Sequence, residues 1–153
     1  PDFVEQVSKT IQTFLIDPEK LKFELTESLV LDNIEETILK MQALKKIGVR
    51  FAMDDFGTGH SSLSYLTRLP IDQLKIDQSF VRNLGLKSTD AIIVQTIIGM
   101  AGNLGMEVIA EGVETEFQHA FLQQHACNLY QGYLFGQPLT IDTFDTCINA
   151  RVR

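Results

Sequence analysis

The sequence predicts an α/β fold in which parallel strands alternate with helices. Short apolar runs typical of strands are followed by stretches in which apolar residues recur at helical spacing. Turn-forming residues such as Asp17, Pro18, Gly48 and Gly105 separate these stretches. This alternation is typical of βα units with a parallel sheet. Right-handed connections then leave two architectures, a doubly wound open sheet and a (β/α) barrel.

The first 48 residues are expected to contain two helices with a strand between them. Apolar residues in 2–16 lie close to helical spacing, and residues 21–27 are expected to form a strand. Asp32, with Glu35 three residues later, is expected to cap a second helix. That helix is expected to end before Gly48, because glycine is the preferred residue just past a helix.

The same alternation continues through the rest of the chain. The remaining elements are expected in this order: a strand at 49–53, a short helix capped by Ser61 or Ser62 and ending before Pro70, a strand at 73–77, a helix at 91–104 capped by Ser88 or Asp90, a strand at 107–110, a helix at 115–125 opened by Thr115 with Gln118, a strand at 126–131 and a helix at 141–150.

Composition excludes several classes of protein. With 153 residues and 44% hydrophobic residues, the chain has the size and composition of one globular domain. A net charge of −7 argues against binding of duplex nucleic acid and against direct membrane contact. No apolar run approaches the ~18–20 residues of a membrane span, and no signal peptide opens the chain. Cys127 and Cys147 are isolated, as expected of reduced thiols in a cytoplasmic protein.

Polar side chains close every predicted strand. They are Glu24 and Glu27 on the first strand, Asp54 and Asp55 on the second, Lys75 and Asp77 on the third, Glu111 and Glu114 on or after the fourth, and Gln131 on the fifth. In a parallel α/β fold the carboxyl ends of the strands lie on one face, and that face carries the active site. The six carboxylates of the first, second and fourth strands, with the lysine and the glutamine, are therefore expected to converge there.

Helix capping is the alternative explanation for an acid that follows a strand. It suffices for Glu27, Asp77 and Glu114, but not for Glu24, which lies inside its strand, nor for Lys75, which lies between two apolar residues. Buried unpaired charges cost several kcal/mol each, and crowded carboxylates repel one another. Divalent cations would resolve both problems.

The acids indicate an oxygen-ligand metal site. Because no cysteine or histidine accompanies them, the expected ions are Mg²⁺ or Mn²⁺, with Ca²⁺ as a geometric relative. Asp54 and Asp55 would point to opposite faces of an ideal strand, so both can serve only if the strand ends or bulges there. Gly57 and Gly59 permit such a departure. An aspartate shared by two ions is typical of two-metal chemistry at phosphorus.

Lys75 has a separate predicted role. Near two cations its ammonium form is expected to be disfavoured. The side chain could orient or deprotonate the attacking water, or it could contact a phosphate oxygen as a cation. The sequence leaves these alternatives open.

Five ordered motifs resemble those of the EAL-domain family of cyclic di-GMP phosphodiesterases. They are ELTES at 24–28, DDFGTG at 54–59, LKID at 74–77, AEGVET at 110–115 and QGYLFG at 131–136. The resemblance covers essentially the whole chain. It implies a TIM-like (β/α) barrel and hydrolysis of cyclic di-GMP to linear 5'-pGpG with two Mg²⁺ or Mn²⁺ ions.

The resemblance also implies a role for each motif residue. Glu24 and Asp54 are similar to ligands of the first ion, and Asp54, Asp55 and Glu111 to ligands of the second. Lys75 is similar to the lysine that positions water and Gln131 to the glutamine near that water and the phosphate, so both are expected to contact substrate. Glu27 is similar to a glutamate that steadies the loop after the two aspartates. The expected catalytic residues are therefore Lys75, Glu111, Gln131 and Glu27.

The family's Glu-Ala-Leu tripeptide and its asparagine ligand are absent from this sequence. We therefore expect residues 1–153 to be the C-terminal portion of a single EAL domain, an incomplete barrel of about five strands with little activity in isolation. An upstream sensory or GGDEF-type domain is expected in the parent protein. An open barrel exposes its edge strand, so either a homodimer or a proteolysed sample is expected. The alternative functions are a non-catalytic cyclic di-GMP receptor or dimerisation module and, more remotely, an unrelated (β/α) phosphate-binding enzyme.

Overall fold

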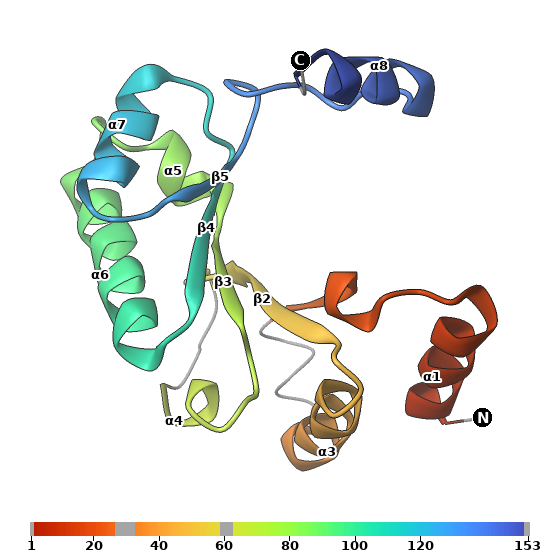
Figure 1. Ribbon diagram of the computed structural model, residues 1–153. Helices are drawn as coiled ribbons and strands as arrows, with labels where there is room; N and C mark the ends of the chain where they lie inside the picture. Colours follow the sequence, from red (N-terminus) through yellow and green to blue (C-terminus); the bar gives the residue numbers. More distant parts are fainter. Residues whose placement is uncertain (1, 27–32, 59–62, 152–153) are drawn as a thin grey trace.

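Five parallel strands form one sheet in the computed structural model, which describes residues 2–26, 33–58 and 63–151 (Figure 1). Their order along the sheet is their order along the chain: β1 (Lys22–Thr26), β2 (Arg50–Phe56), β3 (Gln73–Ile76), β4 (Glu107–Glu111) and β5 (Leu129–Gln131). Every neighbouring pair is parallel. The carboxyl ends of all five strands therefore lie at the same edge of the sheet.

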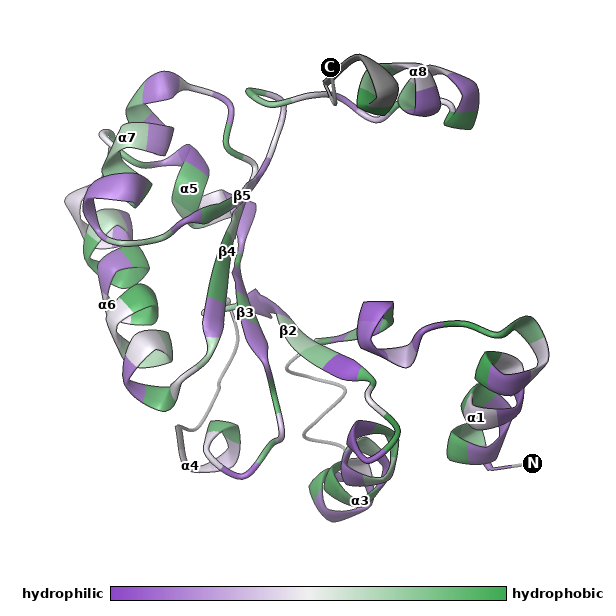
Figure 2. Cartoon of the chain, in the orientation of Figure 1, coloured by the Kyte–Doolittle hydropathy of each residue, from purple (hydrophilic) through white to green (hydrophobic). Residues whose placement is uncertain are grey.

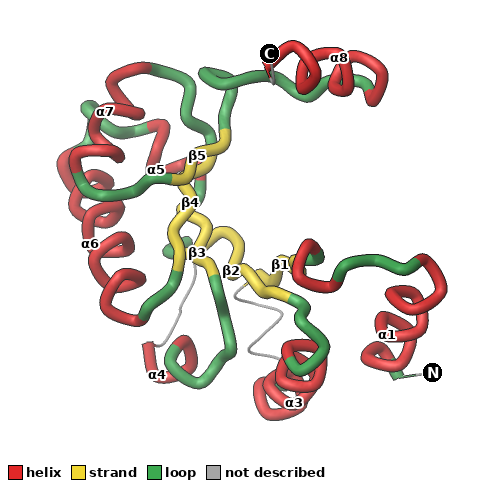
Figure 3. The backbone as a smooth tube through the Cα atoms, in the orientation of Figure 1, coloured by secondary structure: helices red, strands yellow, loops and turns green. Residues whose placement is uncertain are grey.

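Helices connect the strands and cover one side of the sheet. The helical elements are α1 (Phe3–Phe14), η1 (Pro18–Lys20), α3 (Ile34–Lys45), α4 (Leu63–Leu66), α5 (Gln78–Arg82), α6 (Ser88–Leu104), α7 (Glu116–Gln124) and α8 (Ile141–Arg151). The strands form an arc with α3 to α7 along its outer side (Figures 1 and 3). A doubly wound sheet carries helices on both faces, so this arrangement is that of a (β/α) barrel. The predicted fold class is confirmed.

The hydrophobic core lies between the outer face of the sheet and these helices. Leu74 and Ile76 of β3 are fully buried, and they pack in one cluster with residues of α3 and α6 such as Leu44 and Val94. Figure 2 shows that both helices also carry hydrophilic residues, as expected when only one side of a helix faces the core. Because side chains alternate along a strand, Gln73 and Lys75 lie on the opposite, inner face of β3.

Some element boundaries differ from those predicted. The five-residue helix α5 was not predicted, since it is too short for an apolar period to appear. Asn33, not Asp32, caps α3 in the described residues, and α6 begins at Ser88 without a side-chain cap. Strand β5 begins at Leu129, later than predicted, because Ala126 has a left-handed backbone conformation that closes α7. Asp32 itself lies outside the described residues.

No helix within residues 2–26, 33–58 and 63–151 has both the length and the apolar character that crossing a membrane requires.

Asp72 joins three elements at the amino ends of the strands. Its carboxylate pairs with Lys45 of α3 and accepts a hydrogen bond of 2.8 Å from the Phe51 N–H of β2. Its backbone oxygen accepts from the Glu107 N–H of β4. Partial burial favours the neutral acid, but the hydrogen bonds from Lys45 and Phe51 outweigh it, so the pKa of Asp72 lies below its ordinary value of 3.8.

Replacing Asp72 by asparagine is therefore expected to lower the free energy of unfolding at pH 7 by about 1.5 kcal/mol. A lowered folded-state pKa stabilises the protein above the ordinary pKa, and this contribution is lost as the pH falls through the folded-state value. The difference in the free energy of unfolding between wild type and Asp72→Asn, measured by urea unfolding, should consequently become smaller as the pH falls from 5 to 2. Asp145→Asn, an exposed change on α8, is the control. A difference in unfolding free energy that did not depend on pH would show that the Asp72 carboxylate is not stabilised by Lys45 and Phe51.

Candidate metal centre

The carboxyl ends of β1 to β4 bring four charged side chains into contact. The Lys75 Nζ lies 2.7 Å from a Glu24 oxygen, 2.8 Å from an Asp54 oxygen and 2.9 Å from a Glu111 oxygen. The Lys75 side chain is only 8% exposed. Each residue comes from a different strand, so the parallel register of the sheet produces the cluster.

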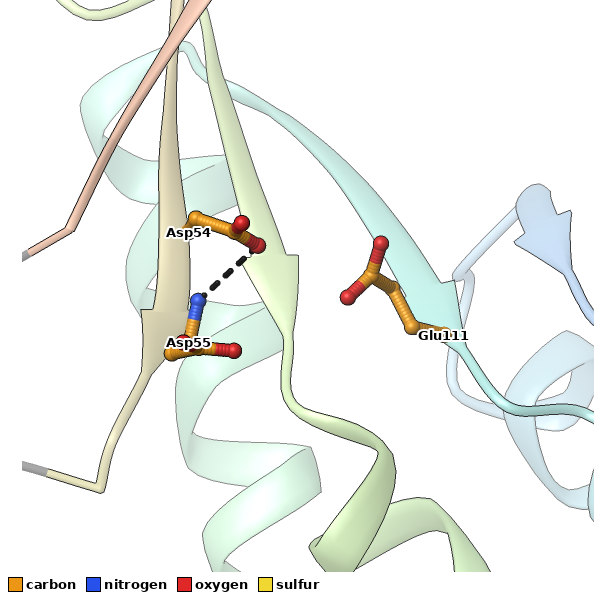
Figure 4. A group of neighbouring side chains, drawn as sticks. All are labelled: Asp54, Asp55 and Glu111. Atoms are coloured by element: carbon orange, nitrogen blue, oxygen red, sulfur yellow. Dashed lines mark hydrogen bonds between the residues drawn. The ribbon is translucent and has the colours of Figure 1, made fainter.

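Asp54 and Asp55 present their carboxylates to the same site although they are neighbours on one strand. Asp55 has a left-handed backbone with φ of 53°, and the pairing of β2 with β3 shifts register between Met53 and Phe56. Of the two predicted alternatives, an ended or a bulged strand, this irregularity is the bulge, and it turns Asp55 away from the face that an ideal strand would give it. The Asp55 N–H donates to the Asp54 carboxylate at 3.1 Å (Figure 4).

Asp54, Asp55 and Glu111 form a cluster suited to an ion (Figure 4). Each offers a carboxylate oxygen, and the three oxygens lie within 4.8 Å of one another. An all-carboxylate donor set fits a hard divalent cation such as Mg²⁺ or Mn²⁺. Glu24 is not part of this group of three, and it meets the site through the ammonium of Lys75.

The electrostatics of the site reflect crowded negative charge. Burial raises the pKa of Glu111, helped by the charges of Asp54 and Glu24 and opposed by Lys75. Burial and the nearby Asp54 and Asp77 raise the pKa of Asp55. For Lys75, burial favours the neutral amine, but its hydrogen bonds to Asp54, Glu24 and Glu111 outweigh it and raise the pKa. The expectation of a disfavoured ammonium concerned Lys75 beside two cations, and the three surrounding carboxylates act in the opposite direction.

A cleft of about 550 Å³ opens beside the cluster. Glu111 and Gln131, which are paired in register on β4 and β5, form part of its wall. Gln78 and Tyr133 also line it, although sequence reasoning did not single them out. The sequence contained a signal for both residues, since Gln78 directly follows the LKID motif and Tyr133 lies within the QGYLFG motif. Glu114 lines the same cleft.

The other acids noted in the sequence have separate positions. Asp77 caps α5, and its carboxylate accepts from the Ser79 N–H at 3.0 Å, so the capping explanation applies to it. Glu114 is not a cap, because Thr115 caps α7 in the predicted capping box. Glu27, predicted to be catalytic, lies outside the described residues.

A family model described as the EAL domain matches residues 1–138. The chain belongs to the EAL domain family. The resemblance inferred from the five motifs is thereby confirmed.

Named relatives and solved structures agree with this membership. The chain is 46% identical over 130 residues to the cyclic di-GMP phosphodiesterase NbdA of Pseudomonas aeruginosa, an alignment that covers 85% of this chain and 17% of NbdA. The solved structure of the PaMucR phosphodiesterase in complex with c-di-GMP is 39% identical with a TM-score of 0.88, covering 92% of this chain and 57% of that one. A manganese and cyclic di-GMP complex of Klebsiella pneumoniae BlrP1 is 35% identical with a TM-score of 0.82, covering 90% and 35%. The aligned part of this chain thus spans about a sixth of the length of NbdA.

Gly132 of this EAL domain allows two loops of the site to meet. A β-carbon there would lie 2.2 Å from the Val113 oxygen and 2.3 Å from the Val113 nitrogen. These backbone atoms already bond the end of β5 and the loop after it, since the Val113 N–H donates to the Gln131 backbone oxygen and the Val113 oxygen accepts from the Leu134 N–H. The close approach therefore holds Gln131 beside the segment that follows Glu111.

Gly132→Ala is expected to lower the free energy of unfolding by at least about 3 kcal/mol, because rigid backbone rather than a side chain must move. Gly136→Ala is the matched control: its added β-carbon would meet no atom within 4 Å, and we expect a change within about 0.5 kcal/mol. Thermal unfolding of the two variants measures the difference. Equal melting temperatures would show that the two loops are not held as described.

Proposed function

We propose that this chain is part of a metal-dependent phosphodiesterase that hydrolyses cyclic di-GMP to linear 5'-pGpG by in-line attack of water. The observation that carries the proposal is the cluster of Asp54, Asp55 and Glu111 beside Lys75, in a family whose named relatives include cyclic di-GMP phosphodiesterases. Every ligand position that the resemblance assigns to this sequence carries a carboxylate. A receptor that only binds nucleotide has no need of these ligands.

Activity in this proposal belongs to the full-length protein. Residues 1–153 would form the C-terminal portion of a single EAL domain. We also propose that the full-length protein has an upstream sensory or GGDEF-type domain and that it forms a homodimer. The upstream domain is supported by the name of MucR, a bifunctional diguanylate cyclase and phosphodiesterase that is 40% identical to this chain. A cytoplasmic location is supported by the free cysteines Cys127 and Cys147.

The carboxylates are proposed to hold two Mg²⁺ or Mn²⁺ ions. Asp54, Asp55 and Glu111 would hold one, and Glu24 with Asp54 would contribute to the other. Divalent cations supply Lewis acidity there, lowering the pKa of bound water and neutralising charge at phosphorus. The manganese and calcium complexes of BlrP1 with cyclic di-GMP support divalent ions in this family.

Lys75 and Gln131 are proposed to orient the phosphate and the water. The Lys75 amine, held by three carboxylates, can contact a phosphate oxygen as a cation or orient the attacking water. The Gln131 amide, in register with Glu111, can donate a hydrogen bond to a phosphate oxygen from the wall of the cleft. Glu27 keeps its proposed role in steadying the loop after Asp55.

The test is to incubate the full-length protein with cyclic di-GMP and Mn²⁺ and to follow the appearance of pGpG by chromatography. Conversion that stops on chelation is the expected result. Binding of cyclic di-GMP in calorimetry without any pGpG would refute the enzyme and favour the receptor. Light scattering of the same sample tests the dimer, which a monomeric mass would exclude.

A further inference from the structure

A second polar network lies on the inner face of the sheet, nearer the amino ends of the strands. The Lys22 Nζ donates to the Gln73 side-chain oxygen at 2.9 Å. The Gln73 amide nitrogen donates to Glu107 at 3.4 Å, and Arg50 pairs with the same Glu107 oxygen at 2.8 Å. This lower network thus joins β1, β2, β3 and β4.

The same four strands form both networks. The upper network consists of Glu24, Asp54, Lys75 and Glu111, and the lower network consists of Lys22, Arg50, Gln73 and Glu107. On β1 and β3 the two members are two residues apart, and on β2 and β4 they are four apart, so all face the same side. Each strand therefore carries one side chain of each network.

Gln73 is the centre of the lower network. It is 5% exposed, and of the described residues only Gln73, Lys75 and Gln118 are buried polar or charged side chains. Gln118 belongs to the capping box of α7, and Lys75 to the upper network. An amide can accept from a cation and donate to a carboxylate at once, which is what Lys22 on one side and Glu107 on the other require.

We propose that Gln73 is a positioning residue that sets the spacing of β1, β3 and β4 and thereby holds Lys75 and its carboxylates in place. Gln73 and Lys75 are two residues apart on one strand, so a shift of β3 relative to its neighbours moves both. A buried amide with charged partners on two other strands resists such a shift, since movement would leave a polar group unpaired. The extension of this role to metal affinity rests on the proposed function, whereas the positioning of Lys75 does not.

The first test needs no metal. Competitive acetylation of the full-length protein, read by mass spectrometry, compares Lys75 with Lys20, whose side chain is 82% exposed. Gln73→Leu, which keeps the volume but removes the amide, is expected to raise the relative acetylation of Lys75 several-fold. Lys22→Met, which removes only one partner of Gln73, should give a smaller increase in the acetylation of Lys75. This variant replaces Gln73→Leu in the test if Gln73→Leu does not fold. Unchanged labelling of Lys75 in the variants that fold would overturn the proposal.

The second test measures Mn²⁺ binding by calorimetry. Gln73→Leu is expected to weaken binding about ten-fold, the lower end of what supporting residues of metal sites contribute. Val94→Ala, a change in the fully buried core of α6, is the control for destabilisation alone and should leave both readouts unchanged. If the wild-type protein binds no Mn²⁺, the proposed function fails while the acetylation result still decides the role of Gln73. Equal effects of Val94→Ala and Gln73→Leu would show that Gln73 is merely structural.

Discussion

Asp54→Ala in the full-length protein is expected to reduce hydrolysis of cyclic di-GMP by at least about 10³-fold. An Asp54 carboxylate oxygen lies within 4.8 Å of the ligand oxygens of Asp55 and Glu111, and Asp54 also contacts Lys75. Asp54 is therefore the residue that the proposed function assigns to both ions. Removing a carboxylate shared by two ions is expected to forfeit about 4 kcal/mol of transition-state stabilisation, which corresponds to that factor. The rate of pGpG formation and the calorimetric affinity for Mn²⁺ should fall together.

Glu116→Ala is the matched control for the loss of a carboxylate. Glu116 lies in the first turn of α7, its side chain is 86% exposed, and its ion pair with His119 spans 3.8 Å. Its removal changes the net charge as Asp54→Ala does, but it should leave the turnover within about two-fold of wild type, because exposed ion pairs contribute little. Near-normal hydrolysis by Asp54→Ala would remove Asp54 from the site.

Lys75→Met is expected to have two separable effects. The loss of a buried cation that orients phosphate or water should lower kcat by about 10²–10⁴-fold. In chelator-treated protein the three carboxylates also lose their shared partner. The free energy of unfolding should then fall by about 3 kcal/mol, the low end for a broken buried ion pair because Glu24 remains half exposed. Mn²⁺ should restore part of that stability, since it supplies the missing positive charge.

The pH dependence of the Lys75 effect follows from its raised pKa. A raised folded-state pKa stabilises the protein fully below the ordinary lysine value of 10.5, and the contribution is lost only as the pH rises through the folded-state pKa. The stability difference between chelator-treated wild type and Lys75→Met should therefore be constant from about pH 7 to 9. A difference that already declined through pH 8 would show that the three carboxylates do not raise the pKa of Lys75.

Hydrophobic periodicity and turn residues were sufficient to predict the strands and most helices of this protein. They were also sufficient to predict that charged residues gather at one edge of the sheet, because the carboxyl ends of parallel strands share that edge. Lys75 between two apolar residues and Glu24 inside a strand were informative, since neither can be explained by helix capping. The same patterns required β2 either to end or to bulge at Asp54 and Asp55, and the structure shows the bulge.

Other features depend on which groups meet in three dimensions. The sequence predicted a disfavoured ammonium for Lys75 beside two cations, but it did not reveal that three carboxylates from three strands surround this lysine and by themselves raise its pKa. The cleft beside Glu111 and the lower network around Gln73 join residues that lie far apart in the chain. Local patterns determine which strands form and which side chains share a face, but pKa values and contacts depend on distances across the sheet, and only tertiary packing sets those distances.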